Sequence, residues 1–373
     1  MQKIKKFLPA LYDVFVTLVS FYLFFRMREW GNIVFGFETG YIFGIIAAVY
    51  LFLNIFMIQF GFFSKSKVMT YIVSIWTFVF MYLSMSVVVC DIVRLISCIF
   101  TKDTYFRERM LEAEGYICIL TVIGFIIYGC MKVKKPVKVY YSFECKNLSH
   151  DMRIVLLSDL HIGFFVGEKH IKKVVDIVNE LDADNVLIAG DIINAGNTEE
   201  CAELTKVSDV LKTMKSKEGT FAVTGNHDPD PNEDEFGKFL RNSNITLLQD
   251  EIYDNGICRI AGRSTVTKTR KALDEITALS DNSKPLFVID HDPRGIKEAK
   301  ESNAALVMCG HTHKGQVFPL NLFVRLVYNS EEFGGFSKSG ETAVAVSAGA
   351  GYFSMPMRVG SDCEIVCIDI KSV

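Results

Sequence analysis

The stretch RIVLLSDLH, residues 153–161, places two metal-ligand side chains directly after a predicted buried strand. Residues 153–158 are mostly apolar, which is typical of a strand buried on both faces, and the run ends abruptly at Asp159 and His161. Open α/β sheets carry their sites beyond the carboxyl ends of their strands. This stretch therefore predicts an α/β domain and the position of its functional site.

Four further blocks repeat this arrangement, each after an apolar run. They are Gly190-Asp191, Gly225-Asn226-His227-Asp228, Asp290-His291-Asp292 and Gly310-His311-Thr312-His313. Any one block alone is typical of an ordinary turn or helix cap. Since five of the seven histidines lie in these blocks, we expect the loops that carry them to converge on one centre.

The residue types in the blocks favour a dinuclear metal site. Carboxylate, imidazole and amide ligands suit divalent Mn, Fe or Zn, and the blocks have none of the thiolates of a structural zinc site. Two such ions can clamp a phosphate group and its attacking oxygen. The sequence therefore predicts two divalent cations as cofactors and a phosphoester as substrate.

The pattern around the blocks predicts the rest of the domain. Amphipathic helical spacing at 169–181 and 201–214 alternates with strand-like runs at 185–189 and 219–224, as in an α/β domain. The later segments are mostly strand-like: 257–261, 286–290, 305–309, 343–347 and 363–370. A second half so rich in strands predicts two packed sheets.

The five blocks, in this order, resemble the calcineurin-like metallophosphoesterase superfamily. Its pattern is DxH, GD, GNH followed by Asp or Glu, H, and GHxH, and the similarity covers residues 152 to 373. The block GHTH followed by Gly315-Gln316-Val317 is similar to a bacterial subgroup that includes membrane-associated enzymes. The resemblance implies two packed mixed β-sheets flanked by helices.

The resemblance also implies roles for individual residues. Asp191 would bridge the two metals, and a metal-bridging hydroxide would be the nucleophile. The other ligands of the first metal would be Asp159, His161 and His313. Those of the second metal would be Asn226, His291 and His311. His227 would donate a proton to the leaving-group oxygen or stabilise the charged phosphoryl group. Asp228 would either orient His227 or be a turn residue before Pro229. Arg358 is either a contact for the substrate phosphate or a surface arginine.

The N-terminal third is of a different character. Four apolar runs, 7–25, 41–63, 71–90 and 116–131, approach the length that spans a bilayer. A signal peptide would explain only the first run, and a buried soluble bundle would carry polar stripes. We therefore expect a four-helix transmembrane region at 1–131, a linker at 132–150 and the α/β metallophosphoesterase domain at 151–373.

Charge divides in the same way. Residues 1–138 hold 15 Lys+Arg and 8 Asp+Glu, whereas residues 139–373 hold 25 and 35. The acidic domain makes nucleic acid an unexpected partner, and the basic N-terminal part suits anionic lipid headgroups. With the N-terminus inside, nine positive residues lie on the inner side and six on the outer side. This count favours a multi-pass protein of the cell membrane with a cytoplasmic catalytic domain.

Three functions fit these features to different degrees. The leading hypothesis is hydrolysis of a phosphoester or pyrophosphate bond in a membrane-associated or lipid-linked substrate. A membrane-tethered metal-binding scaffold or sensor would be favoured by a missing ligand, but the ligand set has no gap. A nuclease is disfavoured by the acidity of the domain and by its membrane tether.

Overall fold

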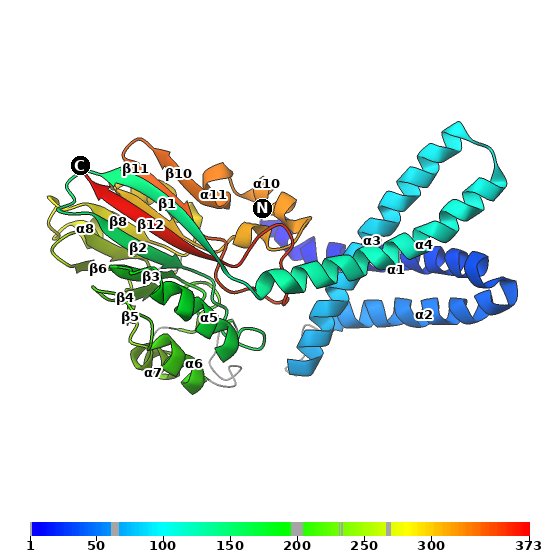
Figure 1. The fold of residues 1–373 in the computed structure, drawn as a ribbon, viewed down its shortest axis with the longest axis horizontal. Coiled ribbons are helices and arrows are strands. Elements are labelled where there is room, and N and C mark those ends of the chain that lie inside the picture. The colour runs from blue at the N-terminus through cyan, green and yellow to red at the C-terminus, as the bar shows by residue number, and fades with distance from the viewer. Residues whose placement is uncertain (1, 61–66, 195–203, 231, 233, 266–269) are drawn as a thin grey trace. The chain divides into compact units, whose positions relative to one another are not determined.

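The computed structural model describes the chain except residues 1, 61–66, 195–203, 231, 233 and 266–269. The chain divides into two compact units, Met1–Tyr128 and Gly129–Val373 (Figure 1). The first unit is helical. The second contains two β-sheets with helices, and all the metal-ligand blocks lie in it.

Two six-stranded mixed sheets form the second unit. In sheet order, the first consists of β1 (Val137–Cys145), β12 (Glu364–Ser372), β2 (Met152–Leu157), β3 (Asn185–Ala189), β4 (Thr220–Val223) and β5 (Thr246–Leu247). The second consists of β10 (Gly335–Ser339), β11 (Thr342–Val346), β9 (Leu306–Cys309), β8 (Leu286–Ile289), β7 (Arg259–Gly262) and β6 (Glu251–Asp254). The predicted α/β domain with two mixed sheets is confirmed.

The central strands of each sheet are buried on both faces, which explains their continuous apolar runs. Along β2, Ile154 and Leu156 belong to the core that side chains of both sheets share, whereas Val155 and Leu157 belong to the core on the other face. This alternation follows from the two-residue period of a strand.

Helices cover the outer faces of the sheets. On α5, the buried residues Ile171, Val174, Val175 and Val178 have the spacing of one helix face. The helices of this unit are α5 (Glu168–Asn179), α6 (Leu204–Leu211), α7 (Asp234–Asn242), α8 (Leu273–Thr277), α9 (Ile296–Glu301), α10 (Leu320–Val327) and α11 (Ser330–Phe333). Helices α5 to α7 contribute to the core outside the first sheet, and α8 and α9 to the core outside the second.

Much of the segment 132–150, which the sequence predicts as a linker, belongs to the first sheet. Strand β1 pairs in parallel with β12, from Val137 opposite Glu364 to Cys145 opposite Ser372. Lys132 also forms an ion pair of 2.5 Å with Asp362. Since α4 ends at Val133, only residues 134–136 separate that helix from the sheet. The partner strand lies at the far end of the sequence, so the residues of the segment alone do not predict this pairing.

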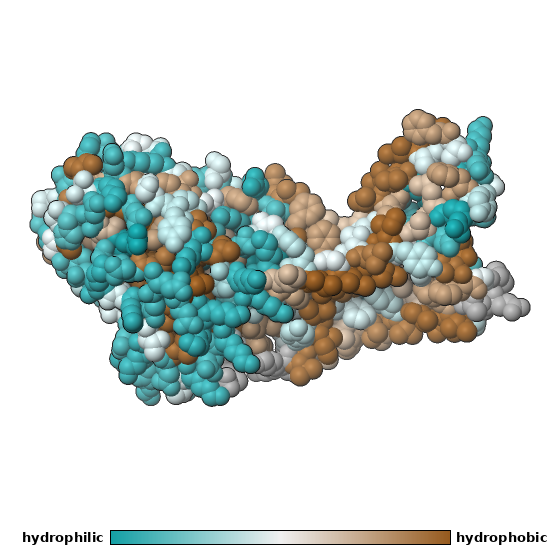
Figure 2. Space-filling view, viewed as in Figure 1, coloured by the Kyte–Doolittle hydropathy of each residue, from teal (hydrophilic) through white to brown (hydrophobic). Residues whose placement is uncertain are grey.

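The described part of the first unit consists of α1 (Gln2–Phe35), α2 (Phe37–Phe60), α3 (Lys67–Phe100) and most of α4 (Thr104–Val133), whose last turns belong to the second unit. Their surface is strongly hydrophobic, in contrast to that of the second unit (Figure 2). Among the described residues, two helices are long and apolar enough to cross a membrane, at Val68–Phe100 and Thr104–Val133, and a shorter apolar helix lies at Tyr41–Met57. Four membrane crossings therefore remain a prediction.

A network of charged side chains joins three helices of this unit. The guanidinium of Arg26 on α1 lies 2.7 Å from Asp91 on α3 and 2.8 Å from Glu114 on α4. Arg94 donates a hydrogen bond of 2.9 Å to Asp91. Arg26 and Glu114 are buried, and buried charges need such partners.

Candidate active site

The metal-ligand blocks follow the carboxyl ends of parallel strands from both sheets. Asp159 and His161 follow β2, Asp191 follows β3, and Asn226 follows β4. From the second sheet, His291 follows β8, and His311 and His313 follow β9. Because the two sheets pack face to face, these loops meet at one end of the domain.

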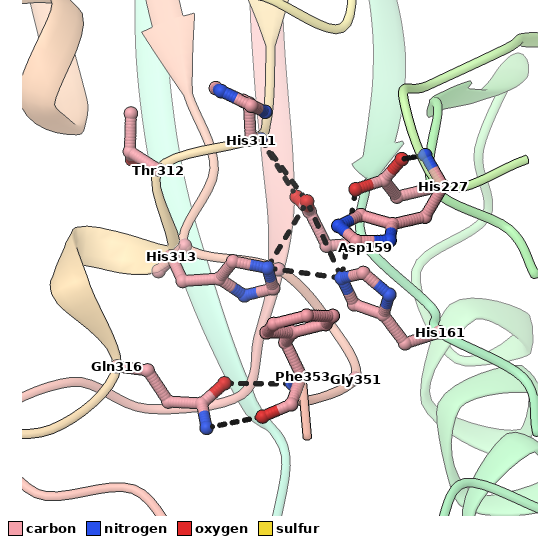
Figure 3. Close-up of polar contacts among 12 residues, drawn as sticks. Asp159, His161, His227, His311, Thr312, His313, Gln316, Gly351 and Phe353 are labelled. Carbon is pink, nitrogen blue, oxygen red and sulfur yellow. Dashed lines mark hydrogen bonds and ion pairs between the residues drawn. The ribbon is translucent and has the colours of Figure 1, made fainter. Parts of the chain in front are cut away.

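One cluster of possible ligands consists of Asp159, His161 and His313 (Figure 3). The Nε2 atoms of His161 and His313 are 3.0 Å apart, and Oδ1 of Asp159 is 3.4 Å from Nε2 of His313. Burial lowers the pKa of His161 to about 3, so its ring is neutral at pH 7. Neutral imidazoles with converging nitrogens form the donor set that a divalent cation requires.

A second cluster consists of Asp191, His291 and His311, with Asn226 beside it. Nε2 of His291 lies 3.1 Å from Nδ1 of His311 and 3.1 Å from Oδ1 of Asn226. The Nδ1 atom of His291 is 2.8 Å from the carbonyl oxygen of Ala189, which directs the other ring nitrogen into the site. A pocket of about 180 Å³ is lined by Asn226, His291 and His311 among others.

Asp191 lies between the two clusters. Its Oδ2 atom is 3.7 Å from Nε2 of His161 in the first cluster and 3.3 Å from Nε2 of His291 in the second. Although burial disfavours the charged ring, the hydrogen bond and charge of Asp191 raise the pKa of His291 to about 10. A divalent cation would replace that proton, because a histidine ligand must be deprotonated.

The ligand loops have an unusual backbone conformation. Positive φ values between 47° and 74° occur at Asp159, His161, Asp191, His311 and His313. Such conformations cost energy for residues other than glycine, and they concentrate at functional sites. Space is also tight, because a Cβ atom on Gly225 would lie 2.1 Å from Oδ1 of Asp191, and one on Gly310 would lie 2.5 Å from Oδ2 of Asp159.

His227 lies beside the first cluster. Its ring centroid is 5.3 Å from that of His161, and its backbone N–H donates a hydrogen bond of 2.8 Å to Oδ1 of Asp191. His227 is half-buried. This position suits a group that transfers a proton without holding a metal.

Asp228 organises the loop rather than orienting His227. Its carboxylate accepts hydrogen bonds from the backbone N–H groups of Ile193 (2.8 Å) and Gly225 (2.7 Å). It thus joins the loop after β3 to the loop after β4. Burial, followed by the charge of Asp191, raises the pKa of Asp228 to about 7. Of the two roles that the sequence leaves open, the geometry favours the turn residue.

The structure also corrects the interpretation of Arg358. Its side chain is fully buried, neither exposed on the surface nor open to a substrate. Nη2 donates hydrogen bonds of 2.7 Å to the carbonyl oxygens of both Ala348 and Gly351, and it lies 3.4 Å from Nδ1 of His313. Arg358 therefore holds the loop after β11 against a ligand residue. Its burial depends on carbonyl groups that converge only in the folded domain.

Phe353 is a site residue that the sequence did not reveal. Its ring centroid is 4.6 Å from that of His227 and 5.2 Å from that of His161 (Figure 3). The side-chain amide of Gln316 forms two hydrogen bonds with the backbone of Phe353. Its Oε1 atom accepts from the N–H of Phe353 at 2.8 Å, and its Nε2 atom donates to the carbonyl oxygen of Phe353 at 2.9 Å. A single aromatic residue in a loop carries no motif that could have identified it.

Comparison with known proteins agrees with this geometry. The family model described as calcineurin-like phosphoesterase matches residues 152–315, which include every ligand residue proposed above. The chain carries a calcineurin-like phosphoesterase domain. That domain is of the metal-dependent hydrolase class, and its Asp and His clusters could bind a metal.

The relatives of this chain include proteins that are named as transmembrane. An uncharacterized metallophosphoesterase of Helicobacter pylori is 32% identical over 58% of this chain and 59% of its own length. A "transmembrane protein with metallophosphoesterase domain" of Danio rerio is 31% identical over 71% of this chain and 63% of its own length. The protein of the same name from Bos taurus is 32% identical over 60% and 54%. The chain thus spans less than two thirds of each of these relatives.

Proposed function

We propose that this phosphoesterase hydrolyses a phosphoester or pyrophosphate bond with two divalent cations, on a substrate that is membrane-associated or lipid-linked. The observation that carries the proposal is the position of Asp191, whose Oδ2 atom lies within 3.7 Å of a ligand nitrogen in each cluster. Bound Mn, Fe or Zn ions would neutralise the phosphoryl oxygens and acidify the attacking water.

Each residue of the site has a part in this reaction. Asp159, His161 and His313 would hold one cation, and Asn226, His291 and His311 would hold the other, with Asp191 between them. His227 would donate a proton to the leaving oxygen. Phe353 packs against His161, His227 and His313, and so restricts the positions that these rings can take.

The connection between helix and sheet supports a substrate at the membrane. Only residues 134–136 separate the end of the apolar helix α4 from strand β1, and Lys134 and Lys135 are exposed. If α4 spans the bilayer, these two lysines would lie beside anionic headgroups. So short a connection holds the domain near the bilayer, where a lipid headgroup has a high effective concentration.

Reconstitution of the full chain in vesicles tests this proposal. A lipid-linked phosphoester should be cleaved much faster when it is in the same vesicles as the enzyme than when it is supplied in separate vesicles. A water-soluble aryl phosphodiester should be cleaved at the same rate in both preparations, with Mn, Fe and Zn supplied in turn. Equal rates for the two presentations, with every lipid-linked ester tried, would exclude a membrane-borne substrate.

We also propose that the protein crosses the cell membrane several times and that the phosphoesterase domain is cytoplasmic. The excess of nine positive residues over six on the predicted inner side supports this orientation. A reporter that is active only in the cytoplasm should be active when fused after Val373. Activity confined to a reporter that works only outside the cytoplasm would reverse the orientation.

A further inference from the structure

We propose that helix α10 inserts its apolar face into the surface of an anionic bilayer, so that a lipid-linked substrate enters the metal site from the membrane. This inference deepens the proposed function and rests on it. It assigns a membrane-contact site to the phosphoesterase domain itself, in addition to the apolar helices of the first unit.

The exposed face of α10 is apolar along its whole length. The exposed fractions are 51% for Leu322, 62% for Phe323, 83% for Leu326 and 76% for Val327. Their spacing, i, i+1, i+4 and i+5, places the four side chains on one side of the helix. No residue of α10 is buried, in contrast to the four buried residues of α5. A continuous exposed apolar patch of this kind marks an interaction surface.

Both ends of α10 are attached to the loop that carries His311 and His313. The loop continues through the short helix His313–Gly315 and residues 316–319 into α10. After α10, the ring of Tyr328 lies 6.1 Å from that of His311, between centroids. Thr312 also donates a hydrogen bond of 2.7 Å to the carbonyl oxygen of Phe333. A molecule bound on α10 would therefore lie only a few residues along the chain from the metal-site loop.

The position of α10 in the second unit points to a lipid surface as its partner. Gly129, in the last turns of the apolar helix α4, accepts a hydrogen bond of 3.2 Å from the backbone N–H of Arg358. The next residue, Val359, pairs with Val317, just before α10. The end of a candidate membrane span and the start of α10 are thus joined through one short segment of the domain.

The charge on α10 complements anionic headgroups. Arg325 is exposed on the helix, and its guanidinium lies 4.5 Å from the ring centroid of Phe333. An apolar face with a cation beside it is typical of helices that lie in the plane of a membrane interface.

Substitutions on the exposed face test the effect on catalysis. In full-length protein reconstituted with a lipid-linked phosphoester, Phe323→Glu and Leu326→Glu should each lower kcat/KM by about tenfold or more, because a charge opposes insertion. Hydrolysis of a soluble aryl phosphodiester should be unchanged. The matched control is Leu279→Glu, because Leu279 is fully exposed, at 101%, and lies outside α10. It should match the wild type with both substrates.

The same assays separate the two proposals. If the wild type hydrolyses the soluble ester and the α10 variants cleave the lipid-linked ester at the wild-type rate, the inference on α10 fails and phosphoester hydrolysis stands. If the wild type cleaves no phosphoester, the proposed function fails instead. A direct measurement of insertion distinguishes contact of α10 with lipid from contact with a second copy of the protein or with another part of the chain.

Quenching of a single tryptophan by brominated lipid provides that measurement. Both native tryptophans, Trp30 and Trp76, lie in the first unit and can be replaced by Phe. In that background, a tryptophan introduced by Phe323→Trp should be quenched by brominated lipids, whereas one introduced by Leu279→Trp should not. Soluble-ester activity verifies the fold of each variant. An unquenched tryptophan at position 323 in an active protein would overturn the inference.

Discussion

Asp191→Asn is expected to remove bound metal and to reduce hydrolysis of a soluble aryl phosphodiester to background. The substitution preserves the shape of the side chain but removes the negative charge that lies 3.7 Å from His161 and 3.3 Å from His291. Asn would also place a donor where one carboxylate oxygen now faces both clusters. Elemental analysis of the purified protein, together with turnover at saturating Mn, Fe or Zn, measures both effects.

The control for this variant is Asp182→Asn. Asp182 is mostly exposed and pairs with Lys217, so both metal content and turnover should be unchanged. If Asp191→Asn retains two equivalents of metal and wild-type turnover, Asp191 does not bridge the cations. A wild-type protein that binds metal but cleaves no phosphoester would instead support the scaffold or sensor that the sequence left as an alternative.

His227→Ala is expected to retain wild-type metal content while turnover falls by about 10²-fold or more, the usual range for the loss of a general acid. His227 packs against Phe353, with ring centroids 4.6 Å apart, and its backbone rather than its ring contacts Asp191. The loss should be largest for esters with a poor leaving group, because those depend most on protonation of the leaving oxygen. A series of aryl esters with leaving groups of different pKa measures this dependence.

Two outcomes would contradict this role for His227. Loss of metal in His227→Ala would show that the ring is a ligand, and an equal loss of turnover across the ester series would exclude proton donation. His150→Ala serves as the control, because His150 is exposed and lies outside the metal-ligand blocks. It should have the metal content and turnover of the wild type.

The strands and the metal-ligand blocks could be predicted because their signals are local. The predicted strand at 153–158 corresponds to β2, Met152–Leu157, and the residues that follow it are those that the fold brings to the site. Burial on both faces requires a continuous apolar run, and a site at the strand ends requires ligand residue types directly after it. Both requirements leave a pattern in consecutive residues.

Other features depend on contacts between distant parts of the chain, and only the tertiary structure decided them. Strand β1 exists as part of a sheet because Val137–Cys145 pairs with Glu364–Ser372. Arg358 is buried because the carbonyl oxygens of Ala348 and Gly351 converge on it. The apolar residues of α10 would be read as core from their spacing alone, yet they are exposed. By itself the sequence determined which residue types follow which strands, since a strand and the ligand residues after it are consecutive in the chain. Burial and exposure were decided by the folded chain, because they depend on the surfaces that distant segments cover.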